Sequence, residues 1–387
     1  MQDNLFYTEE YKKLKNLETA LLQYKTLYFY GAGLRSEEIL QMQREGFLFL
    51  RRPEAFLVTD KKNDSFENPE QLDGIPIYGI DEIAQFPENS AIVVIAMDIY
   101  HDEIRQRLSN LSVPCPDTYY LTDAMEQLLT REFLEGYLPK QGMSAGFLPF
   151  ADDCKVVDSS LYQERIHTYS VMCERDAKTV AHFAEVPWIS NIQAGAVLAE
   201  KKIADIGDDT GENISGLNPY YNELTGLYWV WKNTEHDFSG ICHYRRRFES
   251  DIVLLPLIND EADIILPLPF VVGHDLRTYY QHWGEAVYYD MMLQVIEEKH
   301  PAYYNTAVWC ASHPVFVPNN ICIARKDILD EYCAFLFDVV FSVEEKMAAY
   351  DGKKQKRCWL SEHVSTIYFI YHLRNYRVLF SKIERCW

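Results

Sequence analysis

Short apolar runs alternate with amphipathic segments along the first 135 residues, and this alternation restricts the possible folds more than any other feature. The runs typical of buried strands lie at 26–30, 55–59, 91–96 and 118–121. The segments with the apolar spacing of helices lie at 14–24, 36–45 and 99–108. Strands that alternate with helices predict a parallel sheet with right-handed crossovers, so we expect residues 1–135 to form a Rossmann-like α/β domain.

The segment 136–160 interrupts this alternation. It is rich in glycine and proline and lacks helical periodicity, so we interpret it as a linker between two domains. Beyond it, strands and helices alternate again with longer loops. The expected strands lie at 165–173, 239–244, 263–266 and 376–380, and the expected helices at 176–184, 219–233, 326–341 and 361–372. Residues 161–387 are therefore predicted to form a second α/β domain.

The charge balance excludes one class of partner. The chain carries 58 acidic and 37 basic side chains, a formal net charge of −21. Binding along a phosphate backbone needs clustered lysine and arginine, so we expect no nucleic acid partner. The same acidity makes any local basic cluster informative, because such a cluster is the exception in this chain.

Cysteine usage and apolar runs bear on the compartment. The nine cysteines are scattered and no pair has C-x-x-C spacing, which indicates reduced thiols rather than a disulfide framework or a zinc site. The N-terminus lacks the apolar core of a signal peptide, and no run reaches the roughly 18 apolar residues of a membrane-spanning helix. We therefore expect a cytoplasmic protein, and peripheral contact with membrane-bound machinery at the inner face of the membrane stays open.

The sharpest cluster of positive charge is the run His243-Tyr244-Arg245-Arg246-Arg247. It follows an apolar strand, and ligands of open α/β sheets bind at the carboxyl ends of strands. Adjacent guanidinium groups repel one another by roughly 1 kcal/mol per pair even in water. A bound anion would offset this cost, because each charge-assisted hydrogen bond contributes about 1.5–3 kcal/mol. The run therefore predicts a phosphate or diphosphate site, with a solvated surface as the alternative.

The first strand of the N-terminal domain ends in Gly31-Ala32-Gly33, and Asp60 follows the second strand. Two glycines before a helix let backbone N–H groups approach a phosphate, and an acid after the second strand could bind a ribose hydroxyl. Ser36 stands where a dinucleotide loop has its third glycine. The pattern therefore leaves a bound nucleotide and a tight strand–helix turn as alternatives.

Two adjacent segments carry further candidate binding residues. Residues 208–215 are dense in short polar side chains around one glycine, which is typical of a surface turn or of a binding loop. Residues 220–233 read as an aromatic helix whose rings cannot all share one face. The candidates in and between these segments are Asp208, Asp209, Asn213, Ser215, Asn218, Glu223, Thr225, Tyr228, Trp231 and Lys232.

The last predicted helix begins at Ser361-Glu362, with Ser361 as the N-cap and Glu362 in the first turn. A carboxylate at this position could simply stabilise the helix dipole. A carboxylate at a helix start that faces a pocket could instead act as a general base.

Several of these strings together resemble a family of bacterial capsular-polysaccharide and O-antigen synthesis proteins. The resemblance covers residues 165–373, a little over half of the chain. Its parts are the strings at 209–215, 223–233 (ELTGLYWVWKN), 240–246 (ending in HYRR), 320–324 and 361–362, together with Arg357. The family is regarded as glycosyltransferases of GT-A type, some similar to galactofuranosyltransferases. The N-terminal region resembles, more loosely, the small GAG-type α/β domain attached to several polysaccharide-synthesis enzymes.

The resemblance implies a GT-A-like domain that transfers a hexose, for example galactofuranose, from a nucleotide-diphosphate donor such as a UDP-sugar. The acceptor would be a hydroxyl of a lipid-linked or oligosaccharide glycan. Residues expected to bind the donor diphosphate are Arg245, Arg246, Tyr244, Asn213, Ser215, Asn218 and Cys173. Those expected around the sugar or acceptor are Glu223, Thr225, Tyr228, Trp231, Lys232 and Asn320. The catalytic residues would be Glu362 as acceptor base, with Asp209 and His243.

The family lacks an obvious Asp-x-Asp metal motif. The two arginines, with His243, would then supply the charge that a metal usually supplies. Mn²⁺ or Mg²⁺ is the alternative, with Asp208 and Asp209 as ligands. Family members usually carry a His-Lys pair after the first strand of this domain, whereas Cys173-Glu174 stands here, which leaves the identity of the donor open.

Two other functional classes fit parts of the sequence. The Gly31–Gly33 loop would suit an NAD(P)-dependent sugar-nucleotide oxidoreductase. The second domain would also suit a non-catalytic component of a polysaccharide synthesis complex that binds a glycan or a nucleotide.

Overall fold

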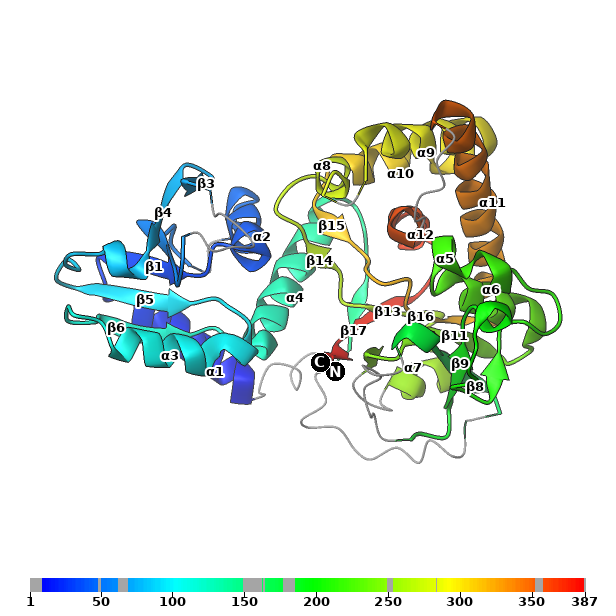
Figure 1. The fold of residues 1–387 in the computed structure, drawn as a ribbon, viewed down its shortest axis with the longest axis horizontal. Helices are drawn as coiled ribbons and strands as arrows, with labels where there is room; N and C mark the ends of the chain where they lie inside the picture. Colours follow the sequence, from blue (N-terminus) through cyan, green and yellow to red (C-terminus); the bar gives the residue numbers. More distant parts are fainter. Residues whose placement is uncertain are drawn as a thin grey trace. The chain divides into compact units, whose positions relative to one another are not determined.

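The structure is a computed structural model that describes residues 9–47, 50–61, 69–148, 162, 164–176, 185–248, 253–282, 284–351 and 358–385. The chain divides into two compact units, residues 1–136 with 271–274 and residues 137–270 with 275–387. Each unit combines a sheet containing parallel strands with helices, as Figure 1 shows. The α/β class predicted from the sequence is confirmed.

The first unit is built on a six-stranded sheet with the order β3-β4-β2-β1-β5-β6. Its strands are β1 (Thr26–Tyr30), β2 (Ala55–Val58), β3 (Gln71–Leu72), β4 (Ile75–Gly79), β5 (Ser90–Val94) and β6 (Asp117–Tyr120). All neighbours are parallel except β3 and β4. The side chains of β2 and β5 are buried throughout, which explains their continuous apolar runs.

Four helices accompany this sheet: α1 (Glu9–Leu21), α2 (Leu34–Arg44), α3 (His101–Ser109) and α4 (Asp123–Lys140). Helix α4 was not predicted from the sequence, and it runs past the expected domain boundary at Gly136. Short 3-10 turns, η1 (Ile80–Glu82) and η2 (Asp98–Tyr100), precede loops or helices in the same unit. Part of the predicted linker, residues 149–160, lies outside the described residues.

The second unit contains a ten-stranded mixed sheet whose main order is β10-β9-β8-β11-β16-β13-β17-β7. Its strands are β7 (Gly146–Phe147), β8 (Ile166–Met172), β9 (Ile189–Gln193), β10 (Ile206–Gly207), β11 (Phe238–His243), β12 (Arg246–Phe248), β13 (Ile264–Pro267), β16 (Cys322–Arg325), β17 (Val378–Ser381) and β18 (Ile383–Arg385). Strands β8 to β11 are parallel, whereas β16 is antiparallel to both of its neighbours. Two further short strands are β14 (Phe270–Val271) and β15 (Val315–Phe316).

The helical elements of this unit are η5 (Glu174–Asp176), η6 (Ala196–Leu198), η7 (Ser215–Leu217), α5 (Asn218–Tyr221), α6 (Leu224–Asn233), α7 (Leu254–Ile258), α8 (Leu276–Tyr280), α9 (Ala286–Lys299), α10 (Pro301–Ala311), α11 (Lys326–Asp351) and α12 (Cys358–His372). None of the helices in the described ranges is long and apolar enough to cross a membrane. The helix expected at 176–184 falls mostly on residues outside those ranges.

One predicted helix is broken. The segment 219–233 forms two helices, α5 and α6, because Asn222 between them has a left-handed φ of 46°. Asparagine tolerates this conformation better than most residues. The break turns the chain so that Glu223 stands at the start of α6 instead of within a continuous helix.

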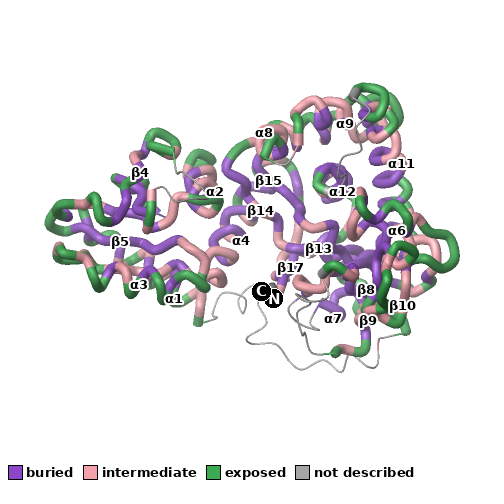
Figure 2. Tube along the Cα trace, viewed as in Figure 1, coloured by how far each residue is buried: buried purple, intermediate pink, exposed green. Residues whose placement is uncertain are grey.

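The central strands of the second unit are buried on both faces, as the purple segments of Figure 2 show around β11 and β13. Ile241 and Ile323 belong to neighbouring strands and are fully buried. Gly240 allows the close approach of these two strands, because a Cβ atom there would lie 1.9 Å from the carbonyl oxygen of Cys322.

We expect Gly240→Ala to destabilise the second unit by about 1–3 kcal/mol or more, because the added methyl group cannot fit without moving β16. All seven tryptophans belong to the second unit, so urea unfolding followed by tryptophan fluorescence reports on it. Gly216→Ala is the control, since the nearest atom to its new methyl group is 4.0 Å away. Equal unfolding midpoints for the two variants would contradict the prediction.

Candidate functional site

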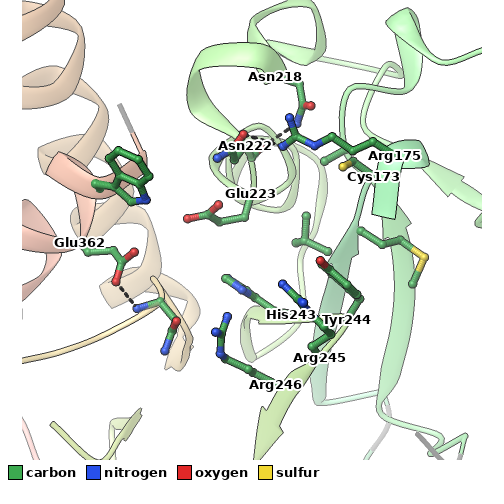
Figure 3. A pocket seen from close by; sticks show the side chains of 15 residues that line it. Cys173, Arg175, Asn218, Asn222, Glu223, His243, Tyr244, Arg245, Arg246 and Glu362 are labelled. Atoms are coloured by element: carbon green, nitrogen blue, oxygen red, sulfur yellow. Dashed lines mark hydrogen bonds between the residues drawn. The ribbon is translucent and has the colours of Figure 1, made fainter. Parts of the chain in front are cut away.

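A pocket of about 300 Å³ opens where the parallel strands β8 and β11 end. The two strands pair in register through His243 and Val171, so their carboxyl ends meet at one edge of the sheet. The structure brings eight of the predicted site residues together here: Cys173, Asn218, Glu223, His243, Tyr244, Arg245, Arg246 and Glu362. Figure 3 shows Glu362 on α12 across the pocket from the residues that follow β11.

The basic run divides at this edge. Strand β11 ends at His243, and β12 begins at Arg246 and turns back along it. Arg245 and Arg246 line the pocket, whereas the Nε of Arg247 lies 3.3 Å from a carboxylate oxygen of Glu384. The Nε of Arg245 is buried and has no hydrogen-bond partner. Two of the three consecutive guanidinium groups therefore contribute positive charge to the pocket.

His243 contributes no charge at neutral pH. Burial, together with the nearby Arg246 and Arg245, lowers the pKa of its imidazole to about 3, although a hydrogen bond to the backbone of Asn319 acts in the opposite direction. The expectation that His243 adds positive charge beside the two arginines is therefore wrong. The pocket contains instead a third cation that the sequence did not single out, Arg175 of η5, whose Nη2 donates to Asn222 Oδ1 at 2.9 Å.

Two carboxyl groups face these cations. Burial and the neighbouring Glu223 raise the pKa of Glu362 to about 8, while a hydrogen bond from Asn319 and the charge of Arg246 oppose the shift. Burial likewise raises the pKa of Glu223, against a hydrogen bond from Asn320 and the charges of Arg246 and Arg175. The two carboxyls are coupled, so their protonation is best described for the pair.

A turn between β15 and β16 holds both carboxyls. Asn319 and Asn320 have left-handed φ values of 68° and 52°. The N–H of Asn319 donates to Glu362 Oε2 at 2.6 Å, and Asn320 Nδ2 donates to Glu223 Oε1 at 2.9 Å. Asn320 was predicted to contact sugar, but it is buried and does not line the pocket. Asn319 was not predicted, although two consecutive asparagines are a recognisable sign of a left-handed turn.

The predicted start of the last helix is wrong. Helix α12 begins at Cys358, so Ser361 lies inside it and is not an N-cap, and Glu362 falls in the second turn. The hydroxyl of Ser361 accepts a hydrogen bond from Asn320 Nδ2 at 3.0 Å. A helix-dipole role for Glu362 is weakened by this position, because the dipole acts mainly in the first turn. Trp359, on the preceding turn of α12, also lines the pocket and was not predicted.

The polar loop 208–215 does not line the pocket. Asp208 is buried, and its carboxylate accepts the N–H groups of Gly195 and Ala196 at 2.9 and 3.0 Å and the hydroxyl of Ser215. Asn213 bonds within the loop, where its Oδ1 accepts the N–H of Ser215 at 3.2 Å. Asp209 is exposed. Within the described ranges, no three His, Cys, Asp or Glu side chains gather as a metal ion would need.

The aromatic residues of α6 hold that loop in place. Tyr228 donates to Glu212 at 2.9 Å, and Trp229 donates to Thr210 at 3.0 Å. Trp231 stacks on Phe337 of α11. The remaining predicted residues of this helix are also outside the pocket: Lys232 lies over the Trp231 ring and near Glu212, and Thr225 is buried against Asn218.

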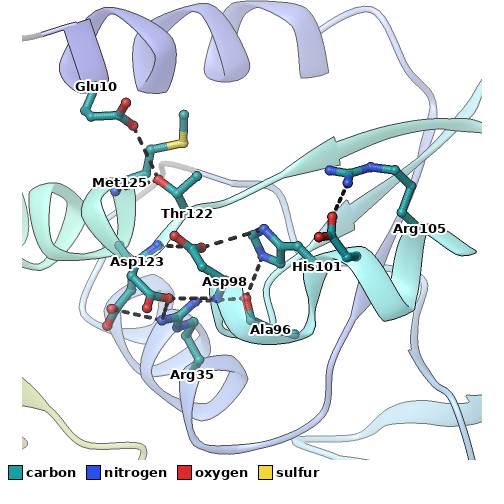
Figure 4. Close-up of polar contacts among 11 residues, drawn as sticks. Glu10, Arg35, Ala96, Asp98, His101, Arg105, Thr122, Asp123 and Met125 are labelled. Atoms are coloured by element: carbon teal, nitrogen blue, oxygen red, sulfur yellow. Dashed lines mark hydrogen bonds and ion pairs between the residues drawn. The ribbon is translucent and has the colours of Figure 1, made fainter. Parts of the chain in front are cut away.

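The Gly31–Gly33 loop lies at the carboxyl end of β1 in the first unit. Gly31 has a left-handed φ of 121°, and Gly33 precedes α2. Figure 4 shows Arg35 of α2 bonded to the carbonyl of Ala96 at 3.0 Å and to Asp123 at 2.6 Å. This ion pair stands beside β5, at the point of the sheet where nucleotides bind in related folds. Asp60 is exposed after β2, and a nucleotide ligand of this loop stays a prediction.

The fold and the pocket define an α/β protein with a pocket of mixed charge at the carboxyl ends of its parallel strands. The chain belongs to the family described as a domain of unknown function, DUF4422, whose profile matches residues 177–373, just over half of the chain. No curated protein matches the sequence.

Among solved structures, the chain is similar to one described as the apo form of WbbM, a bifunctional glycosyltransferase. The two are 22% identical with a TM-score of 0.50, and the match covers 57% of this chain. It spans 45% of that structure, less than half of its length. At this identity the likeness concerns the fold.

The raised pKa of Glu362, from 4.5 to about 8, predicts that the second unit loses stability as pH rises. Between these two pH values the unfolded chain has released this proton and the folded chain retains it. The free energy of unfolding should therefore fall by up to about 1.4 kcal/mol per pH unit on this account. Glu362→Gln removes the dependence, so the variant should gain stability relative to wild type from pH 5 to pH 8.

Urea unfolding at several pH values measures this difference. Glu345→Gln, at an exposed position of α11, controls for the loss of one negative charge. A constant difference between Glu362→Gln and wild type across this range would show that the carboxyl is ionised in the folded protein at neutral pH.

Proposed function

We propose that this protein is a glycosyltransferase. It would transfer a sugar from a nucleotide-diphosphate donor to a hydroxyl of a growing bacterial surface polysaccharide. The observation that carries the proposal is the pocket itself, in which Arg175, Arg245 and Arg246 face the half-buried Glu362. Transfer from such a donor requires both a group that stabilises the leaving diphosphate and a group that accepts the proton of the attacking hydroxyl.

The arginines provide the first requirement. A guanidinium group stays protonated and presents two N–H groups to a phosphate in parallel. The buried Nε of Arg245 lacks a partner, and a phosphate oxygen would satisfy it. As the bond between the sugar and the diphosphate breaks, negative charge grows on the leaving oxygen, and positive charge fixed beforehand stabilises it.

Glu362 provides the second requirement. In its ionised form the carboxylate accepts the proton of the acceptor hydroxyl while that oxygen forms its bond to the anomeric carbon. The electrons of the breaking bond leave with the diphosphate. A direct displacement of this kind inverts the anomeric configuration. Burial and the neighbouring Glu223 together raise the pH at which the carboxylate becomes available.

Two kinds of resemblance, one of sequence and one of fold, support the assignment to the glycosyltransferases. The strings ELTGLYWVWKN and HYRR resemble polysaccharide-synthesis glycosyltransferases, and the fold is similar to that of a bifunctional glycosyltransferase. On this basis we propose a UDP-sugar donor, with galactofuranose or another hexose as the transferred group. The acceptor would be an oligosaccharide or lipid-linked glycan, and catalysis would rely on the arginines rather than on a metal bound by the protein.

Thermal unfolding with UDP, GDP, CMP and their sugars, each with and without Mn²⁺, tests the function. A ligand at 100 times its Kd stabilises the folded protein by about 2.7 kcal/mol, which is readily visible. We expect stabilisation by one diphosphate nucleotide and its sugar. Stabilisation only with Mn²⁺ would instead favour a metal-assisted donor site. No stabilisation by any of these ligands would contradict the proposal.

Arg245→Ala should reduce sugar transfer by orders of magnitude and abolish the stabilisation by a nucleoside diphosphate, because it removes a charged donor from the pocket. Arg247→Ala is the matched control from the same run, since Arg247 lies by Glu384 outside the pocket. The control should transfer sugar at close to the normal rate. Similar losses in the two variants would show that the run acts through general charge rather than through the pocket.

The pH dependence of kcat/KM tests the role of Glu362. Because its pKa is about 8 in the free protein, the ionised fraction should rise roughly tenfold per pH unit below that value and level off above it. Glu362→Gln should lower transfer by about 10²–10⁴-fold and remove this rising limb of the plot of kcat/KM against pH. Glu223→Gln should move the limb to lower pH, because Glu223 raises the pKa of Glu362. A limb that persists in Glu362→Gln would assign the base to another group.

A further inference from the structure

His243 has an unused hydrogen-bonding atom inside the pocket. Its Nε2 is buried and has no hydrogen-bond partner, although the residue lies at the end of β11 where the pocket opens. A buried polar atom without a partner is destabilising, so such atoms are rare in folded proteins. In a pocket, the missing partner is a group that a ligand or a water can bring.

The other ring nitrogen determines which kind of partner fits. The backbone of Asn319 raises the pKa of the imidazole, as a carbonyl oxygen does when it faces a ring N–H. Because Nε2 has no hydrogen-bond partner, we assign this N–H to Nδ1. A neutral imidazole with its proton on Nδ1 has a bare lone pair on Nε2 and can only accept there.

The surrounding charges keep this state in place. Arg245 and Arg246 oppose a second positive charge on the ring, and burial acts in the same direction. Burial raises the pKa of both carboxyls that face the pocket, Glu223 and Glu362, which weakens their compensation of a charged ring. A phosphate oxygen cannot satisfy Nε2, because both atoms are acceptors. The same oxygen does fit the Nε of Arg245, which is a buried donor without a partner.

We propose that Nε2 of His243 accepts a hydrogen bond from a hydroxyl of the transferred sugar and that His243 thereby selects donors carrying a hydroxyl at that position. The inference rests on the proposed function, since it places the sugar of the donor beside the arginines that bind its diphosphate. Arg245 donates a hydrogen bond to the phosphate oxygens of the ligand, and His243 accepts one from the sugar hydroxyl. A ligand that carries the diphosphate but lacks the transferred sugar would leave His243 unsatisfied.

The tautomer can be measured without any ligand. Nitrogen-15 NMR of histidine-labelled protein distinguishes an Nδ1–H ring from an Nε2–H ring, and comparison with His243→Asn assigns the signal. We expect an Nδ1–H tautomer that stays neutral from pH 5 to pH 8. An Nε2–H tautomer would overturn the inference alone, because Nε2 would then be a donor.

The ligand contact is tested with UDP-galactose, UDP-glucose and GDP-mannose, each beside its monodeoxy sugar analogues and the free nucleoside diphosphate. We expect one deoxy position to weaken binding by about 10- to 100-fold in the wild type, the fold-change that corresponds to one unsatisfied buried acceptor. The same sugar nucleotide, but not its nucleoside diphosphate, should shift the Nε2 signal of His243.

Two substitutions at His243 form a matched pair. The amide of Asn reaches the position of Nδ1 and can keep the bond to Asn319, but it leaves the position of Nε2 empty. The amide of Gln reaches the position of Nε2 and can offer an oxygen there. His243→Asn should therefore bind the parent and the deoxy sugar nucleotide equally, whereas His243→Gln should retain part of the preference for the parent.

Each outcome bears on a different statement. Equal binding of all deoxy analogues by the wild type, or binding without any change at His243, would show that water alone satisfies Nε2 and would overturn the inference. The proposed function would survive that result. Absence of binding by every sugar nucleotide would contradict the proposed function, and the sugar contact with it, whatever the tautomer of His243.

Discussion

The peptide turn at Asn319 and Asn320 connects both carboxyls and the imidazole of the pocket. Its backbone donates to Glu362 and raises the pKa of His243, and its second side chain donates to Glu223 and Ser361. These bonds require two consecutive left-handed residues, a conformation that asparagine accepts at lower cost than most side chains. The turn thereby joins α12, β11 and the start of α6. Moving it would release both carboxyls and the imidazole together.

Local sequence patterns predicted the bounds of an element correctly where its own residues determine its conformation. Strand β1 has the predicted bounds, and β8 and β11 differ from them by a residue or so, because continuous apolar runs bounded by turn residues admit few alternatives. Placing the arginines at a strand end followed from the same pattern. The bounds of α5, α6 and α12 did not follow, since they depend on Asn222 and on the contact between Ser361 and Asn320, which is distant in sequence.

The side-chain roles were harder to predict than the elements, and the aromatic helix shows why. The string at 223–233 is one of those on which the family resemblance was predicted, yet only its first residue, Glu223, lines the pocket. Tyr228 and Trp229 instead bond to the loop that follows β10. A sequence string can therefore be characteristic of a family because its residues support the fold around the pocket rather than bind the ligand. Sequence alone does not distinguish packing from sugar binding, because both use the same aromatic residue types at the same spacing.

The protonation of Glu362 places opposite demands on the pocket. With Glu362 neutral, the arginines are opposed by fewer negative charges, which would favour the diphosphate of the proposed donor. As the proposed base, the same group must be ionised. The chain as a whole offers no help, since its net charge of −21 repels an anion at long range and salt screens that repulsion beyond about 8–10 Å. Affinity for an anion must therefore arise within the pocket, from the guanidinium groups that line it. A proton lost from Glu362 strengthens the base but weakens that attraction, so binding and proton transfer favour opposite ends of the same titration.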